Sequence, residues 1–303
     1  MGNCCGKRKR ENGCNDRKNS GDQILSPFSA EWKFKIDDLR NLSGCLYGKC
    51  HYDAKIPGLQ YFVSVFRSTV DSGAWILLNV NGSNERNIRV ECTFYIPSAN
   101  VQSKNLRCIY KSKYDGILFP LFYKTSELFD SKSKLFVDEE LTIIVQGSFR
   151  APIPSVSKIL TPISFKWKIK KEDLKEIVNK GSNDGHLCSG EISVSSFSHV
   201  SYHLSIYPNK IREGENEAQT ELYLNVETGN EKKIEAIFDF SIDSVNYNHG
   251  NQSFWKEFKE YKTFLCSTEN LFDPFEKYFV DGILTINFNG FLMAEETRIS
   301  ILK

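Results

Sequence analysis

The sequence predicts a mainly β protein, with two antiparallel β-sandwiches in tandem behind a disordered N-terminal leader. Aromatic residues are abundant, with 22 Phe, 13 Tyr and 4 Trp against only 2 Met, and aromatic and β-branched residues favour strands. A set of sequence blocks also occurs twice, in the same order, along the 303 residues. Within these blocks apolar and polar residues alternate, which is the pattern of a half-buried strand.

The repeated blocks indicate an internal duplication, because similar segments in a constant order mark a repeated structural unit. The spacing between the two copies drifts only in polar loops, where insertions are tolerated. The matched blocks are Trp32–Leu39 and Trp167–Leu174, Tyr61–Phe66 and Tyr202–Tyr207, Leu78–Val80 and Leu224–Val226, Arg89–Phe94 and Lys233–Phe238, Leu128–Asp130 and Leu271–Asp273, Phe136–Asp138 and Phe279–Asp281, and Leu141–Ile143 and Leu284–Ile286.

Most of these blocks predict strands. In Ile234–Ile242 every second residue is apolar, and Asn, Gly and Ser separate the short strand-like runs, as expected for antiparallel sheets. A helix is predicted over Lys170–Lys180, where apolar residues follow helical spacing and Gly181 ends the pattern. A second short helix is expected within Phe254–Leu265.

Composition shifts predict four segments. Residues 1–27 are rich in Gly, Asn, Lys, Arg and Ser and read as a disordered leader. Residues 150–163 contain three prolines and are predicted to form a stiff linker or an edge segment, because proline fixes φ and cannot donate to a sheet. The two sandwiches then occupy residues 28–149 and 164–303.

Charge and cysteine content exclude several classes of function. Six bases against two acids give the first 18 residues a charge of +4, and the rest of the chain therefore carries −3 of the net +1. A nucleic-acid-binding protein normally carries its basic surface on the folded domain, so no nucleic-acid partner is expected. The nine cysteines are scattered without paired spacing, which predicts free thiols in a reducing compartment. No apolar run is long enough to span a membrane or to act as a secretory signal.

The start of the leader carries the sharpest chemical signal. Removal of Met1 exposes Gly2 for N-myristoylation, and neighbouring cysteines can accept palmitate. The pattern prefers Ser or Thr at position six, where this chain has Gly6, and the competing interpretation is an ordinary disordered tail. The predicted residues are Gly2, Cys4 and Cys5 for lipid attachment, and Lys7, Arg8, Lys9 and Arg10 for contact with anionic lipid.

The repeated blocks resemble the MATH (meprin and TRAF homology) domain, here in tandem as in the expanded nematode branch of that family. The similarity covers nearly everything after residue 27 and is more specific in the second copy. It is carried by Trp167–Ile169, Tyr202–Pro208, Leu222–Leu224, Phe238–Phe240 and Tyr278–Ile286. The resemblance implies an eight-stranded antiparallel sandwich that binds short, extended peptide segments of partner proteins and is not itself catalytic.

Three residues of the second copy are predicted to bind peptide. Tyr223 lies between Leu222 and Leu224 and should point away from the core. Phe238 matches a groove position of the family, although its phase with neighbouring apolar residues favours the core over the groove. Tyr261 remains from a block that reads Trp-Gly-Phe in relatives and Lys-Glu-Tyr here, so groove and core are both open for it, and the family's usual ligand motif is in doubt.

The expected function is that of a membrane-anchored adaptor that recruits a protein partner to the cytoplasmic face of a membrane, the plasma membrane in particular. The alternative is a soluble substrate adaptor of the ubiquitin pathway without its ligase-binding domain. No enzyme, cofactor or metal site is predicted. His199 and His203 lie too far apart along a strand-like run to share one metal, and Cys188 lacks the motifs of a nucleophile. The oligomeric state stays open.

Overall fold

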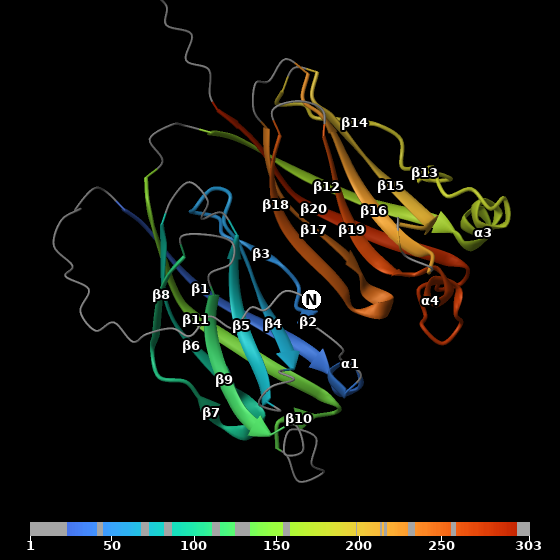
Figure 1. The fold of residues 1–303 in the computed structure, drawn as a ribbon. Helices are drawn as coiled ribbons and strands as arrows, with labels where there is room; N and C mark the ends of the chain where they lie inside the picture. Colours follow the sequence, from blue (N-terminus) through green and yellow to red (C-terminus); the bar gives the residue numbers. More distant parts are fainter. Residues whose placement is uncertain are drawn as a thin grey trace, which may run out of the picture.

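The structure is a computed structural model. It describes residues 23–295 apart from the segments 41–44, 68–72, 82–86, 111–115, 125–133, 154–157, 198, 213, 215–216, 230–233 and 256–258. The chain is mainly β, and its strands form four antiparallel sheets, two on each side of the molecule (Figure 1). We call residues 23–153 the first unit and residues 158–295 the second unit.

The first unit contains two sheets around one hydrophobic cluster. One sheet has the order β1-β11-β6-β7, with β8 also on β6 and β10 on β11; the other has the order β2-β4-β5-β9, with β3 also on β4. The strands are β1 (Gln23–Lys35), β2 (Cys45–Tyr47), β3 (His51–Tyr52), β4 (Gln60–Arg67), β5 (Gly73–Asn81), β6 (Ile88–Ile96), β7 (Val101–Gln102), β8 (Leu106–Tyr110), β9 (Gly116–Lys124), β10 (Phe136–Val137) and β11 (Glu140–Pro152).

The second unit is built in the same way around a second cluster. Its sheets have the orders β12-β20-β17-β18 and β13-β15-β16-β19, with β14 also on β15. The strands are β12 (Lys158–Lys170), β13 (Leu187–Cys188), β14 (Ile192–Ser193), β15 (Ser201–Lys210), β16 (Gln219–Glu227), β17 (Ile234–Ile242), β18 (Tyr247–Trp255), β19 (Lys259–Ser267) and β20 (Ile283–Glu295).

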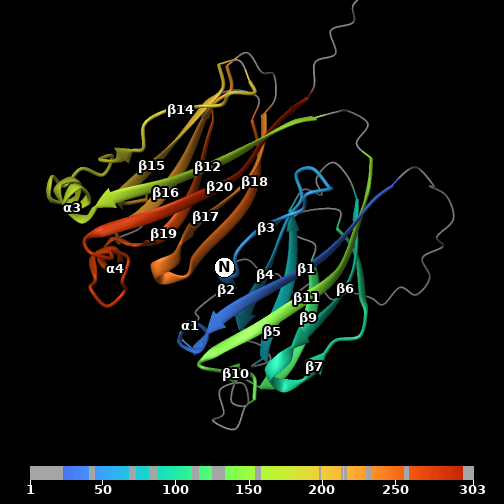
Figure 2. The same ribbon diagram turned by 180° about the vertical axis from the view of Figure 1, so that it is seen from behind.

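Equivalent residues occupy equivalent positions in the two units. Trp32 of β1 lies opposite Ile143 of β11, and Trp167 of β12 lies opposite Ile286 of β20. Both tryptophans are buried in their clusters, as expected for residues that anchor a core. The strands that carry them run side by side with their partners in both units (Figure 2).

Two glycines mark the same close approach in both units. Gly147 of β11 lies opposite Cys92 of β6, and Gly290 of β20 lies opposite Phe238 of β17. A Cβ atom at either position would overlap a backbone carbonyl oxygen of the neighbouring strand. Only glycine therefore lets the two strands approach this closely.

The predicted linker is largely part of two strands. β11 continues to Pro152 and β12 already begins at Lys158, and β12 lies at the edge of its sheet, as the edge-segment alternative predicts. Pro162 is tolerated because β12 is an edge strand, where the missing N–H donor can face away from the sheet. Proline content alone does not distinguish a linker from an edge strand.

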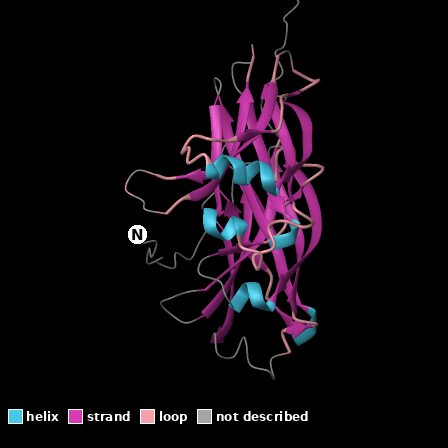
Figure 3. Ribbon diagram, turned by 90° about the vertical axis from the view of Figure 1, so that its right-hand side faces the viewer, coloured by secondary structure: helices cyan, strands magenta, loops and turns pink. Residues whose placement is uncertain are grey.

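The helices are short and lie between strands (Figure 3). The predicted helix over Lys170–Lys180 is confirmed as α3 (Lys171–Asn179), and Gly181, which follows the C-cap residue Lys180, has φ +65. The helix expected within Phe254–Leu265 is wrong for the described residues of that range, because Phe254 and Trp255 belong to β18 and Lys259–Leu265 belong to β19. From Glu260 to Leu265 the side chains of β19 alternate between exposed and more buried positions, as in a half-buried strand. The remaining helices are α1 (Ile36–Arg40), η1 (Pro97–Ala99), η2 (Asp243–Val245) and α4 (Thr268–Phe272).

The two units are joined by a buried polar network. The Tyr52 hydroxyl of the first unit donates to Asp239 Oδ1 of the second at 2.5 Å. Gln60 Nε2 donates to the Phe238 backbone oxygen at 3.0 Å and also to the Tyr52 hydroxyl, while its own Oε1 accepts from Asn81. Gln60 and Asp239 are both buried, so the hydrogen bonds between the units satisfy polar groups that packing removes from water.

Apolar contacts surround this network. The Tyr52 ring packs edge-on against Phe291 at a centroid distance of 5.4 Å, and the Tyr47 ring packs against His249 at 6.5 Å. Ile237, on the face of β17 turned away from its own cluster, is fully buried. The region around β2 and β3 therefore covers the outer face of the β17–β20 sheet.

Candidate functional site on the second unit

The candidate site is the outer face of the β13-β15-β16-β19 sheet. On β16, Leu222 and Leu224 belong to the hydrophobic cluster, so Tyr223 between them points to the opposite face. In register across the sheet, Tyr223 lies between Ser205 of β15 and Lys262 of β19. This face lies away from the polar network that joins the two units.

Tyr223 lies on the predicted face but is not freely exposed. Only 6% of the residue is accessible, because its ring packs against that of Tyr207 at a centroid distance of 4.7 Å. A residue on a central strand has neighbours on both sides, and strand alternation does not reveal them. Replacing Tyr223 would therefore remove packing against Tyr207 as well as a surface contact.

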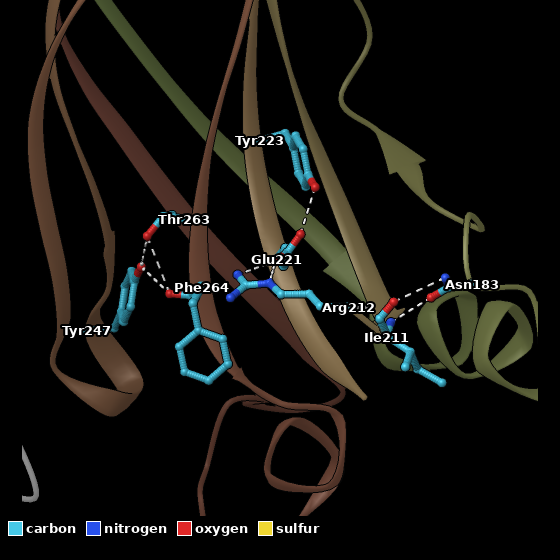
Figure 4. A network of polar contacts seen from close by, with 8 residues as sticks. All are labelled: Asn183, Ile211, Arg212, Glu221, Tyr223, Tyr247, Thr263 and Phe264. Atoms are coloured by element: carbon cyan, nitrogen blue, oxygen red, sulfur yellow. Dashed lines mark hydrogen bonds and ion pairs between the residues drawn. The ribbon is translucent and has the colours of Figure 1, made fainter. Parts of the chain in front are cut away.

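Beside Tyr223 lies a buried carboxylate held by two partners. Glu221 is 1% exposed; its Oε1 accepts from the Arg212 guanidinium, with Nε at 2.7 Å, and its Oε2 accepts from the Tyr223 hydroxyl at 2.7 Å (Figure 4). Burial by itself would raise the pKa of Glu221, but hydrogen bonds from Tyr223 and Arg212 outweigh it, so the pKa lies below its ordinary value. Burial and the adjacent carboxylate raise the pKa of Tyr223. At neutral pH the site thus holds a charged carboxylate between a guanidinium and a neutral phenol.

Exposed side chains border this buried group on β19. Phe264 is 47% exposed although it is a large apolar residue, and Lys262 and Glu260 on the same face are also exposed. The Tyr247 hydroxyl of β18 donates to the backbone oxygen of Phe264 at 3.1 Å (Figure 4). This bond ties β18 to β19 and fixes the strand that carries the exposed phenylalanine.

A loop covers the opposite border, at β15. The ring of His186 stacks on Tyr207 at a centroid distance of 4.6 Å, and Lys210 Nζ lies 5.3 Å from the centre of the same ring. Lys210 also pairs with Asp184 at 2.6 Å, and its hydrogen bond lowers the pKa of Asp184. Tyr207 is therefore held between a loop histidine and a lysine rather than left mobile.

Phe238 lies in the core. It is fully buried within the second cluster and packs against the ring of Phe288 at 5.8 Å. Its phase with Ala236 and Phe240 places it on the inner face of β17, so the groove position expected from the family resemblance is wrong for direct ligand contact. A ligand on the outer face of the other sheet cannot reach it.

Tyr261 of β19 also points inward, toward the space between the two sheets of the second unit. Its ring lies 5.1 Å from that of Phe238, and its hydroxyl is 2.6 Å from His249 Nε2. Since His249 contacts Tyr47 of the first unit, Tyr261 connects the core of the second unit with the interface between the units. The structure therefore does not bring Tyr223 together with Phe238 and Tyr261 on one surface.

The predicted lipid-contact residues Gly2, Cys4, Cys5 and Lys7–Arg10 lie outside the described residues, which begin at Gln23. Within the described part of the chain no helix is long and apolar enough to cross a membrane. The six cysteines described in the structure form no disulfide.

The sequence-based prediction missed the residues that shape this face. Glu221 and Tyr223 share one phase of β16, and a Glu in the same alternating strand as two buried leucines was a signal for a paired, covered carboxylate. Arg212, Tyr207 and Phe264 come from other strands or loops. No local pattern connects them, because their proximity depends on the register of β15, β16 and β19.

This face of the second unit combines aromatic side chains, the buried Glu221 carboxylate paired with Arg212, and exposed charges of both signs. Such a surface can bind a side chain or an extended chain by contact and hydrogen bonding. Among the described residues, no group of three His, Cys, Asp or Glu side chains is placed to hold a metal ion.

Comparison of the chain with protein-family models finds no match, and comparison with curated proteins also finds none. The resemblance to MATH domains therefore rests on the sequence blocks quoted above, and the fold described here rests on the structure of this chain.

Proposed function

We propose that this chain is a non-enzymatic adaptor whose second unit binds a short, extended peptide of a partner protein. The observation that carries the proposal is the face formed by Tyr207 and Tyr223 over the Glu221–Arg212 pair, with Phe264 exposed at its border. Aromatic residues and arginine are enriched where proteins bind one another. An exposed phenylalanine held on a rigid strand is suited to contact an apolar side chain of a ligand.

The strand order supports the same proposal. β19 lies at one edge of its sheet among the described strands, and an extended peptide can pair with a sheet edge while its side chains contact the adjoining face. If β13 and β14 are counted as one interrupted strand on β15, the described strands of the second unit number eight, which supports the proposal of a MATH-like domain.

Exposed charges define the expected ligand chemistry. Lys262 and Glu260 share one face of β19 with Phe264, and part of the Arg212 side chain is accessible. The favoured peptide carries an apolar residue for Phe264 and charged residues that complement Lys262 and Glu260. This pattern differs from the usual Ser/Thr-rich ligand that the family resemblance would imply.

In our proposal, the leader anchors this adaptor to a membrane. A single myristoyl chain gives a membrane association constant of only about 10⁴ M⁻¹, and stable anchoring needs a second signal. The cysteines and the basic run that follow Gly2 in the leader supply two such signals. The proposed location is therefore the cytoplasmic face of a membrane, where anionic lipids gather.

The test uses a displayed library of random peptides selected on the full chain. Affinity of the selected peptides is then measured for wild type, Phe264→Ala and Phe275→Ala. Phe275 is the matched control because it is 89% exposed but lies after α4 and not on β19. Phe264→Ala should weaken binding by about 1–2 kcal/mol, roughly 5- to 30-fold, with Phe275→Ala unchanged. Equal affinities for all three proteins would contradict the proposed face.

A further inference from the structure

A strip of lysines lies along one edge of the second unit. β12 is at the edge of the β12-β20-β17-β18 sheet among the described strands, and it carries Lys166, Lys168 and Lys170 at alternate positions. All three are exposed, while Trp167 and Ile169 between them are buried in the hydrophobic cluster. The three lysines, which we call the lysine strip, therefore share the outer face of β12 and recur about every 6.6 Å along it.

The lysine strip also carries backbone groups that face the free edge. β12 pairs with β20 along its whole length without a shift of register, and in an antiparallel pair every second residue directs its N–H and C=O away from the partner strand. Pro162 has no N–H and is accommodated where that group would face away from the sheet. Lys166 and Lys168 lie an even number of residues from Pro162, so their backbone groups face the free edge as well.

The equivalent edge of the first unit has the same backbone but a different charge. β1 is also at the edge of its sheet among the described strands. Three pairs of residues occupy equivalent positions in the two edges: Pro27 and Pro162, Lys33 and Lys168, and Lys35 and Lys170. Lys33 Nζ lies 3.9 Å from Glu31 and 3.8 Å from Glu140. The second unit has Lys166 in place of Glu31 and Ile283 in place of Glu140, so it has replaced both acids that compensate this lysine in the first unit.

The lysine strip is not compensated from the neighbouring strand either. Among the described residues, none of its three lysines forms an ion pair. The residues opposite them on β20 are uncharged: Asn287, Thr285 and Ile283. Positive charges about 6.6 Å apart repel one another. A ligand with negative charges at the same spacing would replace this repulsion by attraction.

We propose that β12 binds an extended acidic segment of a partner protein, which adds to the sheet as a further antiparallel strand. An extended chain places side chains on one face at the same two-residue interval as the lysine strip. Asp or Glu at alternate positions of the segment therefore lies opposite the lysines, where pairs of opposite charge are favourable. The backbone of the segment pairs with the outward N–H and C=O groups of β12.

The free backbone groups decide between a polypeptide and a membrane as the partner. An anionic membrane could contact the lysines, but it has no extended chain to pair with the edge of the sheet. The site lies on a different sheet from the face that carries Tyr223 and Phe264, so the inference goes beyond the proposed function. It gives the second unit a separate contact for a partner of acidic sequence.

The test measures binding of two fluorescently labelled peptides of equal composition to the full chain at low salt. One peptide alternates Thr and Glu, and the other carries the same Glu residues side by side between Thr residues. The alternating peptide should bind more tightly, because only its carboxylates match the lysine strip. Lys168→Gln/Lys170→Gln should weaken its binding about 5-fold, since two cross-strand pairs of opposite charge are lost. The control Lys33→Gln/Lys35→Gln removes the same charge from the equivalent positions of β1 and should leave binding unchanged.

Charge reversal gives a second measurement. Lys168→Glu/Lys170→Glu should bind a peptide that alternates Thr and Lys, which the wild type should not bind. Equal affinities for the two Glu peptides, or for the two double glutamine variants, would overturn the proposal. Phe264→Ala should bind the acidic peptide as the wild type does, so failure of the peptide face on the other sheet leaves this test intact.

Two other roles of the lysines have their own outcomes. Lysines on an edge strand can prevent edge-to-edge association of sheets. Self-association of Lys168→Gln/Lys170→Gln in sedimentation, with unchanged affinity for the acidic peptide, would overturn the proposal in favour of that role. Weaker binding of the same variant to phosphatidylserine vesicles, with unchanged affinity for the peptide, would overturn it in favour of a membrane contact.

Discussion

Asp239 makes the contact between the two units sensitive to pH. Its carboxyl group is buried, 6% exposed, and accepts a hydrogen bond from Tyr52. Burial raises the pKa of Asp239 to about 6, and the hydrogen bonds from Tyr52 and Asn289 offset only part of that effect. The charged form is therefore disfavoured in the packed state.

The magnitude follows from linkage. Relative to an ordinary value of 3.8, a folded-state pKa of about 6 is a rise of about two units, and each unit corresponds to about 1.4 kcal/mol. The folded state binds the proton more tightly than the unfolded state, so this contribution to stability is present below pH 4 and is lost between about pH 4 and pH 6. Above pH 6 the buried carboxylate costs about 3 kcal/mol.

Asp239→Asn removes this cost because the amide stays neutral and keeps an oxygen for the Tyr52 hydroxyl. The variant and wild type should be nearly equally stable at pH 4, and the variant should be about 3 kcal/mol more stable at pH 7. Urea unfolding of the full chain, followed by circular dichroism at several pH values, measures the difference. Asp243→Asn on η2, where the side chain is partly exposed, is the control for the substitution itself.

A stability difference between Asp239→Asn and wild type that does not vary between pH 4 and pH 7 would refute the reasoning. It would show that Asp239 stays charged and well solvated, and hence that the two units do not pack as described. A reduced slope of the denaturant dependence in the variant would instead indicate a change in cooperativity, and the comparison is made only where the slopes agree.

Three further predictions concern the repeat, the candidate site and the leader. Gly147→Ala and Gly290→Ala should each destabilise the protein by about 1–3 kcal/mol in thermal unfolding, because the added methyl group overlaps a neighbouring backbone; a neutral effect at either would disprove the close approach. Arg212→Ala should cost about 1–2 kcal/mol of stability, since it leaves the buried Glu221 carboxylate with fewer donors; an unchanged melting temperature would show that water replaces the guanidinium. Gly2→Ala should move the chain from the membrane to the soluble fraction of cells, because acylation needs the glycine amine; a wild-type chain found only in the soluble fraction would exclude anchoring.

Part of the candidate site could be predicted from local patterns. The alternation in β16 correctly placed Tyr223 on the face opposite Leu222 and Leu224. Its burial could not be predicted, because the covering ring of Tyr207 belongs to another strand. The inward position of Tyr261 was equally hidden, since it depends on the approach of β18 and its His249.

The sequence by itself determined the class of the fold and its repetition. Strand alternation, the glycine after α3 and the repeated blocks are local signals, and each reflects backbone geometry over a few residues. The leader lies outside the described residues, so the predictions about it also come from the sequence alone. The tertiary structure decided where the strands end, as in the run from β11 into β12. It also decided which polar groups are buried together: Tyr52 and Asp239 are 187 residues apart in the chain. Such contacts depend on how whole sheets pack against each other, and no short stretch of sequence contains that information.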